Sequence, residues 1–188
     1  MNCLKIFIIS FFCVIPASAN ENVEDVKTFA KGVVELISEK KWKEFSKIIH
    51  PKEGVKFSPY TYVRETAVTL NSEQFLDLTK NKKKLSWGFY EGSGEPIQLN
   101  LNEYYQEFLY KLPYAQSQPS KPNEKPMTIG STVNNIPEVF SGESVLTVQF
   151  FILKDKEELF DSGGLTVVLK KDQEKLYVIG LVNCYWGP

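Results

Sequence analysis

The fold of this chain is decided by the stretch HPKEGVKFSPYTYV, residues 50–63. Pro51 ends a helical pattern, because the residue before a proline is pushed out of helical geometry. Gly54 allows a turn, and Val55 then begins an extended segment. Pro59 has no N–H to donate to a sheet ladder, so we expect it at a sheet edge or a bulge. The chain therefore changes from helix to strand within this stretch.

Two helical patterns precede it. Between residues 23 and 37, apolar residues recur at three- and four-residue spacing, which predicts an amphipathic helix. A shorter pattern from Trp42 to Ile49 predicts a second helix. His50, the one histidine of the chain, then stands at a helix terminus. Its imidazole would either bind the last helix carbonyls or act as a general base at the mouth of a pocket.

The first nineteen residues have the pattern of a secretory signal peptide. Lys5 precedes an apolar run at 6–15, and Ala17-Ser18-Ala19 offers a cleavage site of small residues. This run is well short of the roughly 20 residues that cross a bilayer as a helix. We therefore expect an exported protein, periplasmic or secreted, with no stable membrane span after cleavage. Residues 20–188 would form a single domain.

Composition excludes several classes of function. The chain has 22 Lys and Arg against 23 Asp and Glu, a formal net charge of −1, so no basic face for a nucleic-acid partner is expected. Two of the three cysteines, Cys3 and Cys13, lie in the signal segment, which leaves Cys184 without an intramolecular partner. One histidine and one thiol do not make a metal cluster. We expect no metal and no cofactor.

The middle of the chain alternates helix, strand and loop. Asn71 with Gln74 three residues later predicts a capping box at the start of a third helix. Strands are predicted at 85–90 and 97–101, and Asn102 as the cap of a fourth helix. Residues 114–127 contain three prolines among polar residues and predict a surface loop.

The last third predicts strands only. A weak strand at 133–140 is followed by stronger ones at 145–153, 165–169 and 176–182, in the manner of an antiparallel meander. Gly180, alone inside the last strand, indicates a bulge or bend. The predicted fold class is α+β, with N-terminal helices packed on a curved antiparallel sheet. This order of elements resembles the cone-shaped, cystatin-like fold of the nuclear-transport-factor-2 superfamily.

The stretch at 50–63 and a second one, WGFYEGSGEPI at 87–97, resemble the signature of a family of exported bacterial proteins, many of them lipoproteins, with the motif HPxxGVxFSPYxYV. The resemblance implies export and a nuclear-transport-factor-2-like fold, and it implies no established activity. At the C-terminal end the family carries His and Asp where this chain has Asn183 and Cys184, so the chain lacks that acid–base pair.

If the strands pair as predicted, several aromatic side chains come together. They would form either a filled core or the wall of a ligand pocket on the concave sheet face, with charged residues at its rim. The candidate ligand-binding residues are His50, Tyr60, Tyr62, Arg64, Trp87, Tyr90, Glu91 and Trp186. We identify no catalytic residue.

Three functions fit this sequence. The first is an exported binding module for a small molecule or an envelope component. The second is an enzyme of the same fold that uses acid–base chemistry in the pocket, with His50 or Glu91 as the base. The third is a structural or protein-interaction component of the cell envelope, with the loop at 114–127 as its contact. A carboxylate buried beside the aromatic residues would favour the enzyme, and an exposed aromatic patch over a filled core would favour the interaction protein.

Overall fold

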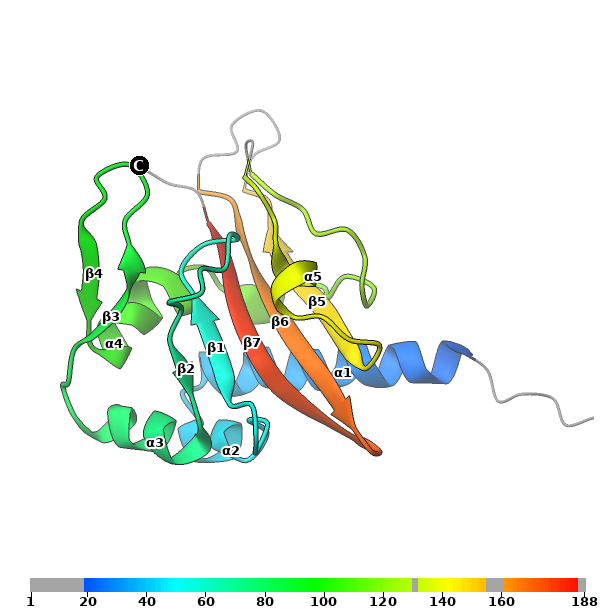
Figure 1. Cartoon of the computed structure of the whole chain (residues 1–188). Coiled ribbons are helices and arrows are strands. Elements are labelled where there is room, and N and C mark those ends of the chain that lie inside the picture. Colours follow the sequence, from blue (N-terminus) through cyan, green and yellow to red (C-terminus); the bar gives the residue numbers. More distant parts are fainter. Residues whose placement is uncertain (1–18, 130–131, 155–160, 186–188) are drawn as a thin grey trace, which may run out of the picture.

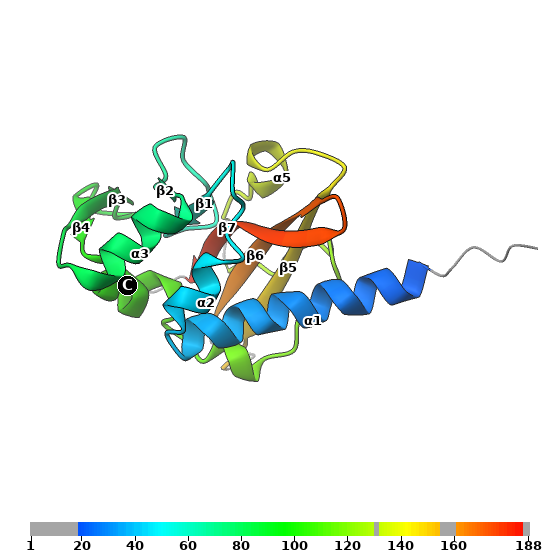
Figure 2. The ribbon, with the colours of Figure 1, turned by 90° about the horizontal axis from the view of Figure 1, so that it is seen from below.

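The computed structural model describes residues 19–129, 132–154 and 161–185. It opens with a long helix, α1 (Ala19–Ser38), which confirms the predicted amphipathic helix. The second helix, α2 (Trp42–Ser46), is shorter than the predicted one, which ran to Ile49. Both lie on the same side of a twisted sheet, as Figures 1 and 2 show. The predicted signal segment at 1–18 lies outside the described residues. Within the described part, no helix combines the length and the apolar character needed to cross a bilayer.

The main sheet has five strands in the order β2-β1-β7-β6-β5. Their bounds are β1 Val55–Ser58, β2 Thr69–Leu70, β5 Val145–Ile152, β6 Gly163–Asp172 and β7 Lys175–Tyr185. The antiparallel meander of β5, β6 and β7 is confirmed. The prediction of an all-antiparallel sheet is wrong, because β1 runs parallel to β7, with Phe57 opposite Leu181. The sheet is therefore mixed, and the α+β class holds.

The elements between β2 and residue 109 form a lobe beside the main sheet (Figure 1). They are helix α3 Ser72–Lys80, strands β3 Leu85–Phe89 and β4 Pro96–Leu99, helix α4 Leu101–Tyr104 and the π-helical turn η1 Tyr105–Leu109. The 3-10 turn η2, Tyr114–Gln116, packs against α1 and β5 instead. Strands β3 and β4 pair with each other as a second, two-stranded sheet.

Two helix caps decide where the helices of this lobe begin. The Asn71–Gln74 capping box of α3 is confirmed, with both reciprocal hydrogen bonds present. The predicted cap at Asn102 is wrong. Asn100 caps α4 instead. Its side chain accepts hydrogen bonds from the backbone N–H groups of Asn102 and Glu103, and the Glu103 carboxylate accepts the backbone N–H of Asn100.

Two predictions in the last half of the chain are corrected. The segment at 114–127 is more than a surface loop, because Tyr114 is fully buried and the backbone N–H groups of Ser120 and Asn123 donate to carbonyls of β5. The segment thus covers the edge of the sheet, where unpaired strand groups would otherwise be exposed. The predicted strand at 133–140 contains instead a one-turn helix, α5 (Ile136–Val139), with Pro137 in its first turn, where the missing N–H costs nothing.

The two faces of the main sheet carry different layers. The face toward α1 forms the principal core, which includes Val167, Leu169 and Leu181. The opposite face carries α5 (Figure 2) and a smaller cluster around Ile136, which includes Val168 and Ile179. Successive residues of a strand point to opposite faces. Val167 and Leu169 of β6 therefore lie in the principal core, and Val168 lies in the smaller cluster.

A β-bulge in β7 confirms the prediction made from Gly180. Val168 pairs with Gly180 but Leu169 pairs with Val178, so Ile179 is the extra residue. The ring of Phe140 lies on Gly180, where an added Cβ would come within 2.6 Å of the Phe140 Cζ atom. Glycine is therefore what lets the segment after α5 pack onto β7.

Replacing Gly180 by Ala will destabilise the fold by about 1–3 kcal/mol, since the Phe140 ring must move out of a packed layer. The matched control is Gly32→Ala in α1, where an added Cβ meets nothing within 4 Å. There the better helix former gives a gain of about 0.5–1 kcal/mol. Chemical denaturation of both variants measures the difference. Equal stabilities would show that Phe140 does not rest on Gly180.

Candidate functional site

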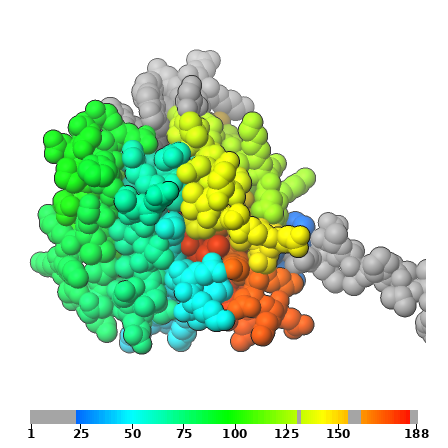
Figure 3. All heavy atoms as spheres, in the orientation of Figure 1, coloured from blue at the N-terminus to red at the C-terminus, as the bar shows by residue number. Residues whose placement is uncertain are grey.

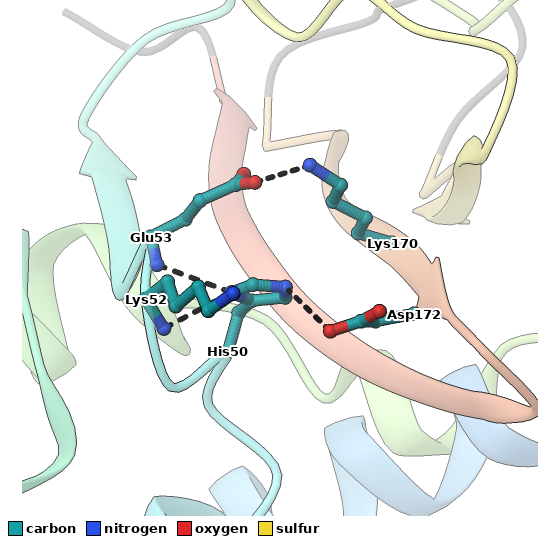
Figure 4. Close-up of polar contacts among 5 residues, drawn as sticks. All are labelled: His50, Lys52, Glu53, Lys170 and Asp172. Carbon is teal, nitrogen blue, oxygen red and sulfur yellow. Dashed lines mark hydrogen bonds and ion pairs between the residues drawn. The ribbon is translucent and has the colours of Figure 1, made fainter.

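His50 is a structural residue in the turn before β1. The helix α2 ends at Ser46, so His50 is no helix-terminal residue and the interpretation as a cap of helix carbonyls is wrong. Its Nδ1 instead accepts the backbone N–H groups of Lys52 and Glu53, at 3.2 and 3.1 Å. Its Nε2 lies 3.9 Å from the Asp172 carboxylate of β6 (Figure 4).

Both ring nitrogens of His50 face other groups of the protein. Because Nδ1 accepts two N–H groups, the neutral ring carries its proton on Nε2, which faces Asp172. The ring is only 3% exposed and packs edge-on against Tyr177. A nearby ion pair between Glu53 and Lys170 joins the same two parts of the chain (Figure 4). His50 thus joins the turn before β1 to strand β7, through its N–H to the Val178 carbonyl at 3.1 Å and its ring on Tyr177, while the Glu53–Lys170 pair joins the same turn to β6.

Trp87 lies in the packed core of the second lobe. It is 1% exposed, and its Nε1 donates to the carbonyl of Leu99 at 2.8 Å. Its ring stacks on Tyr104, with centroids 3.9 Å apart, and meets Phe57 edge-on. The space enclosed between this ring and the segment at 58–67 amounts to about 10 Å³, which is room for about one water molecule.

Tyr60 and Tyr90 form a half-buried pair on the ring of Phe108. The Tyr60 hydroxyl accepts the backbone N–H of Glu91 at 3.2 Å, and burial raises its pKa above the ordinary value. Burial, and then a hydrogen bond to the Glu107 carboxylate, raise the pKa of Tyr90 to about 12. Glu107 belongs to the π-helical turn η1, a type of turn that is frequent at functional sites. The sequence pattern did not identify this residue as part of a site.

The structure brings together part of the predicted set. Tyr60, Tyr62, Arg64 and Trp87 border the same small space. Tyr62 is 46% exposed, and Arg64 and Glu91 also point largely to solvent. His50 lies at the other end of β1, and Trp186 lies outside the described residues. The ligand-binding role assigned to these residues stays a prediction.

A much larger hollow lies on the face of the sheet that carries α5, the face that Figure 3 shows. Its volume is about 610 Å³, within the range of sites for small ligands. Residues 123–126, residues 134–142 and strand β5 border it. Its apolar lining comes from Pro126, Ile136, Pro137, Phe140 and Val145. Asparagine, serine and threonine side chains lie among them.

No sequence pattern indicated this hollow, because one of its walls was predicted as a strand and another as a surface loop. The segment at 123–127, which forms the outer wall of the hollow, is held to β5 by side-chain amides. Gln149 Oε1 accepts the N–H of Met127 at 2.7 Å and its Nε2 donates to the Met127 carbonyl at 2.8 Å. Asn135 pairs in the same way with both backbone groups of Val63, which holds the other wall in place.

Cys184 is buried beside the hollow's outer wall. Burial raises the pKa of its thiol, which contacts the Met127 carbonyl at 3.5 Å, so the thiolate form needed for reaction is disfavoured. Across the part of the chain that the structure describes, no three His, Cys, Asp or Glu side chains gather in a way that would hold a metal ion.

Comparison of the chain with family models, with curated proteins and with solved structures gave no match.

Trp87→Ala will destabilise the fold by about 3–5 kcal/mol, because it empties a packed site and leaves the Leu99 carbonyl without its donor. Phe89→Ala is the matched control. Phe89 lies two residues away on the same strand and is 45% exposed, so its loss will cost about 0.5 kcal/mol or less. Thermal unfolding of the two variants tests this. A Trp87→Ala variant as stable as wild type would mean that Trp87 lines an open pocket.

Tyr90 will titrate near pH 12 and will make stability pH-dependent in the alkaline range. The folded protein holds the phenol neutral, so this contribution is complete below the ordinary tyrosine pKa of about 10. It is lost as the pH rises through about 12. Glu107→Gln will lower the pKa of Tyr90 while burial keeps it above the ordinary value.

The measurement is tyrosinate absorbance against pH, with Tyr90→Phe subtracted to isolate the signal. A Tyr90 titration that Glu107→Gln leaves unchanged would show that the two side chains do not interact.

Proposed function

We propose that this chain is an exported binding module that takes a small, largely apolar ligand in the hollow between α5 and β5. The hollow itself carries this proposal, because its volume of about 610 Å³ and its apolar lining with scattered polar groups are those of ligand sites. The aromatic residues around Trp87 then serve as the packed support of β1.

The same proposal includes the location and the finer fold. The pattern at 1–19 supports export. N-terminal helices on one face of a twisted sheet that ends in a meander support the nuclear-transport-factor-2-like, cystatin-like cone. The motif at 50–63 supports membership of the exported family that it resembles. Fold likeness alone says little about function, so the hollow has to be tested by itself.

Ser141→Trp will block the hollow without unfolding the protein, because Ser141 is exposed and borders it. The matched control is Glu143→Trp, two residues on, which is exposed and does not border the hollow. Native mass spectrometry of protein purified from its source organism will show a bound small molecule on wild type and on the control. The Ser141→Trp variant will carry none.

Equal ligand occupancy in the wild type and both variants would place the site elsewhere, and protein that never carries a ligand would overturn the proposal.

A protein-interaction role is the second candidate, and a separate observation favours it. The exposed rings of Tyr62 and Phe89 border the same shallow space as Arg64, next to a filled core. Exposed aromatic side chains of this kind are enriched in protein interfaces. In this case the double variant Tyr62→Ser with Phe89→Ser will lose a protein partner in cross-linking from the source organism, and Ser141→Trp will keep it.

A further inference from the structure

The polar groups that border the hollow indicate the chemistry of the ligand's head group. Two asparagine side chains border the hollow, Asn123 and Asn134. In each, the carbonyl oxygen is already used inside the protein. Asn123 Oδ1 accepts the N–H of Thr147 at 2.8 Å, and Asn134 Oδ1 accepts the N–H of Ile136 at 2.9 Å. These bonds fix the orientation of both amides, since the NH₂ group cannot accept an N–H.

The two amide nitrogens are therefore the groups left for a ligand. Neither donates a hydrogen bond to any residue that the structure describes, and no buried side-chain polar atom in that part of the chain lacks a partner. The Asn134 NH₂ group is consequently open to the hollow or to solvent, and Asn123 is itself an exposed residue. They are donors only, so a ligand that meets them must present acceptors.

Two charged side chains of opposite sign, Glu124 and Lys125, border the hollow. Lys125 borders the hollow and forms no ion pair within the described residues, which leaves its ammonium group available. The neighbouring carboxylate, Glu124, is partly engaged, because its Oε2 accepts the backbone N–H of Lys121 at 3.0 Å. Three available donors thus border the same hollow as the apolar side chains of Ile136, Phe140 and Val145, which we call its apolar floor.

We infer that the ligand of this hollow is an amphiphile with an aliphatic body and a carboxylate-type head group, the body on the apolar floor and the head at Asn123, Asn134 and Lys125. The inference rests on the proposed function and specifies its ligand class. Hydrogen bonds from amides and an ammonium group to an ionised oxygen acceptor are about twice as strong as those between neutral groups.

The test uses three probes with the same chain and different heads: octanoate, 1-octanol and octylammonium. Wild type is expected to bind octanoate at least tenfold more tightly than octylammonium, as measured by titration with backbone-amide NMR shifts followed at the hollow.

The decisive variant is Asn134→Asp, which keeps the Oδ1 acceptor for Ile136 and replaces only the free NH₂ donor by oxygen. It is expected to lose the preference for octanoate while its thermal stability stays that of wild type. The control is Asn100→Asp, a cap whose Oδ1 also accepts backbone N–H groups but which does not border the hollow.

The outcomes separate the two levels of the proposal. If all three probes bind the hollow equally, or if Asn134→Asp leaves the head-group preference unchanged, the ligand class is wrong and the binding function stands. If none of the probes shifts the residues of the hollow, both are overturned. If Asn100→Asp changes the preference as much as Asn134→Asp does, the effect is one of general charge and the head-group site is wrong.

Discussion

The parallel pairing of β1 with β7 places the first strand of the chain beside the last one. Lys56, Phe57 and Ser58 lie opposite Gly180, Leu181 and Val182. Through this ladder, the turn that carries His50 and the helices before it are joined to the C-terminal meander. A parallel pair cannot be closed by a tight hairpin, so its two strands must be brought together by the packing of everything between them. The rest of the fold therefore depends on this contact.

The segment after β1 also depends on this pairing. The chain leaves β1 at Pro59, whose carbonyl accepts a hydrogen bond from Asn183 Nδ2 at 3.0 Å, and Tyr114 donates to the same Asn183. Val63 is then held by Asn135, just before α5. A buried polar network of this kind is stabilising only when each member has its partners. The Asn135–Val63 pair fixes the segment after β1 on the sheet face that carries α5, and with it one wall of the hollow.

Several local features could be predicted from the sequence because they depend on neighbours in the chain. The amphipathic helix α1, the Asn71–Gln74 capping box and the bulge at Gly180 all follow from spacing and residue type. The meander could be predicted from short strands separated by polar turns. Each of these rules acts over a few residues.

The missed features depend on contacts across the fold. Nothing in the residues of β1 specifies that its partner runs parallel to it, so the sheet was predicted as antiparallel. The apolar spacing around Pro137 fits a strand as well as a turn of helix, and tertiary packing decided for α5. Glu107, in the π-helical turn η1, makes a hydrogen bond with Tyr90, a contact between distant parts of the chain that apolar periodicity does not reveal. The hollow lies between residues 123–126, residues 134–142 and the strands β5 and β6, and its shape depends on how these segments pack, so no single stretch of the chain indicates it.

The most direct measurement of the central contact is a set of backbone nuclear Overhauser effects in isotope-labelled protein. The parallel ladder predicts cross-strand effects between amide and Hα protons of Phe57 and residues next to Leu181, without the strong Hα–Hα effects of an antiparallel pair. Strong Hα–Hα effects between these strands, or none of either kind, would contradict the parallel pairing on which both faces of the sheet depend.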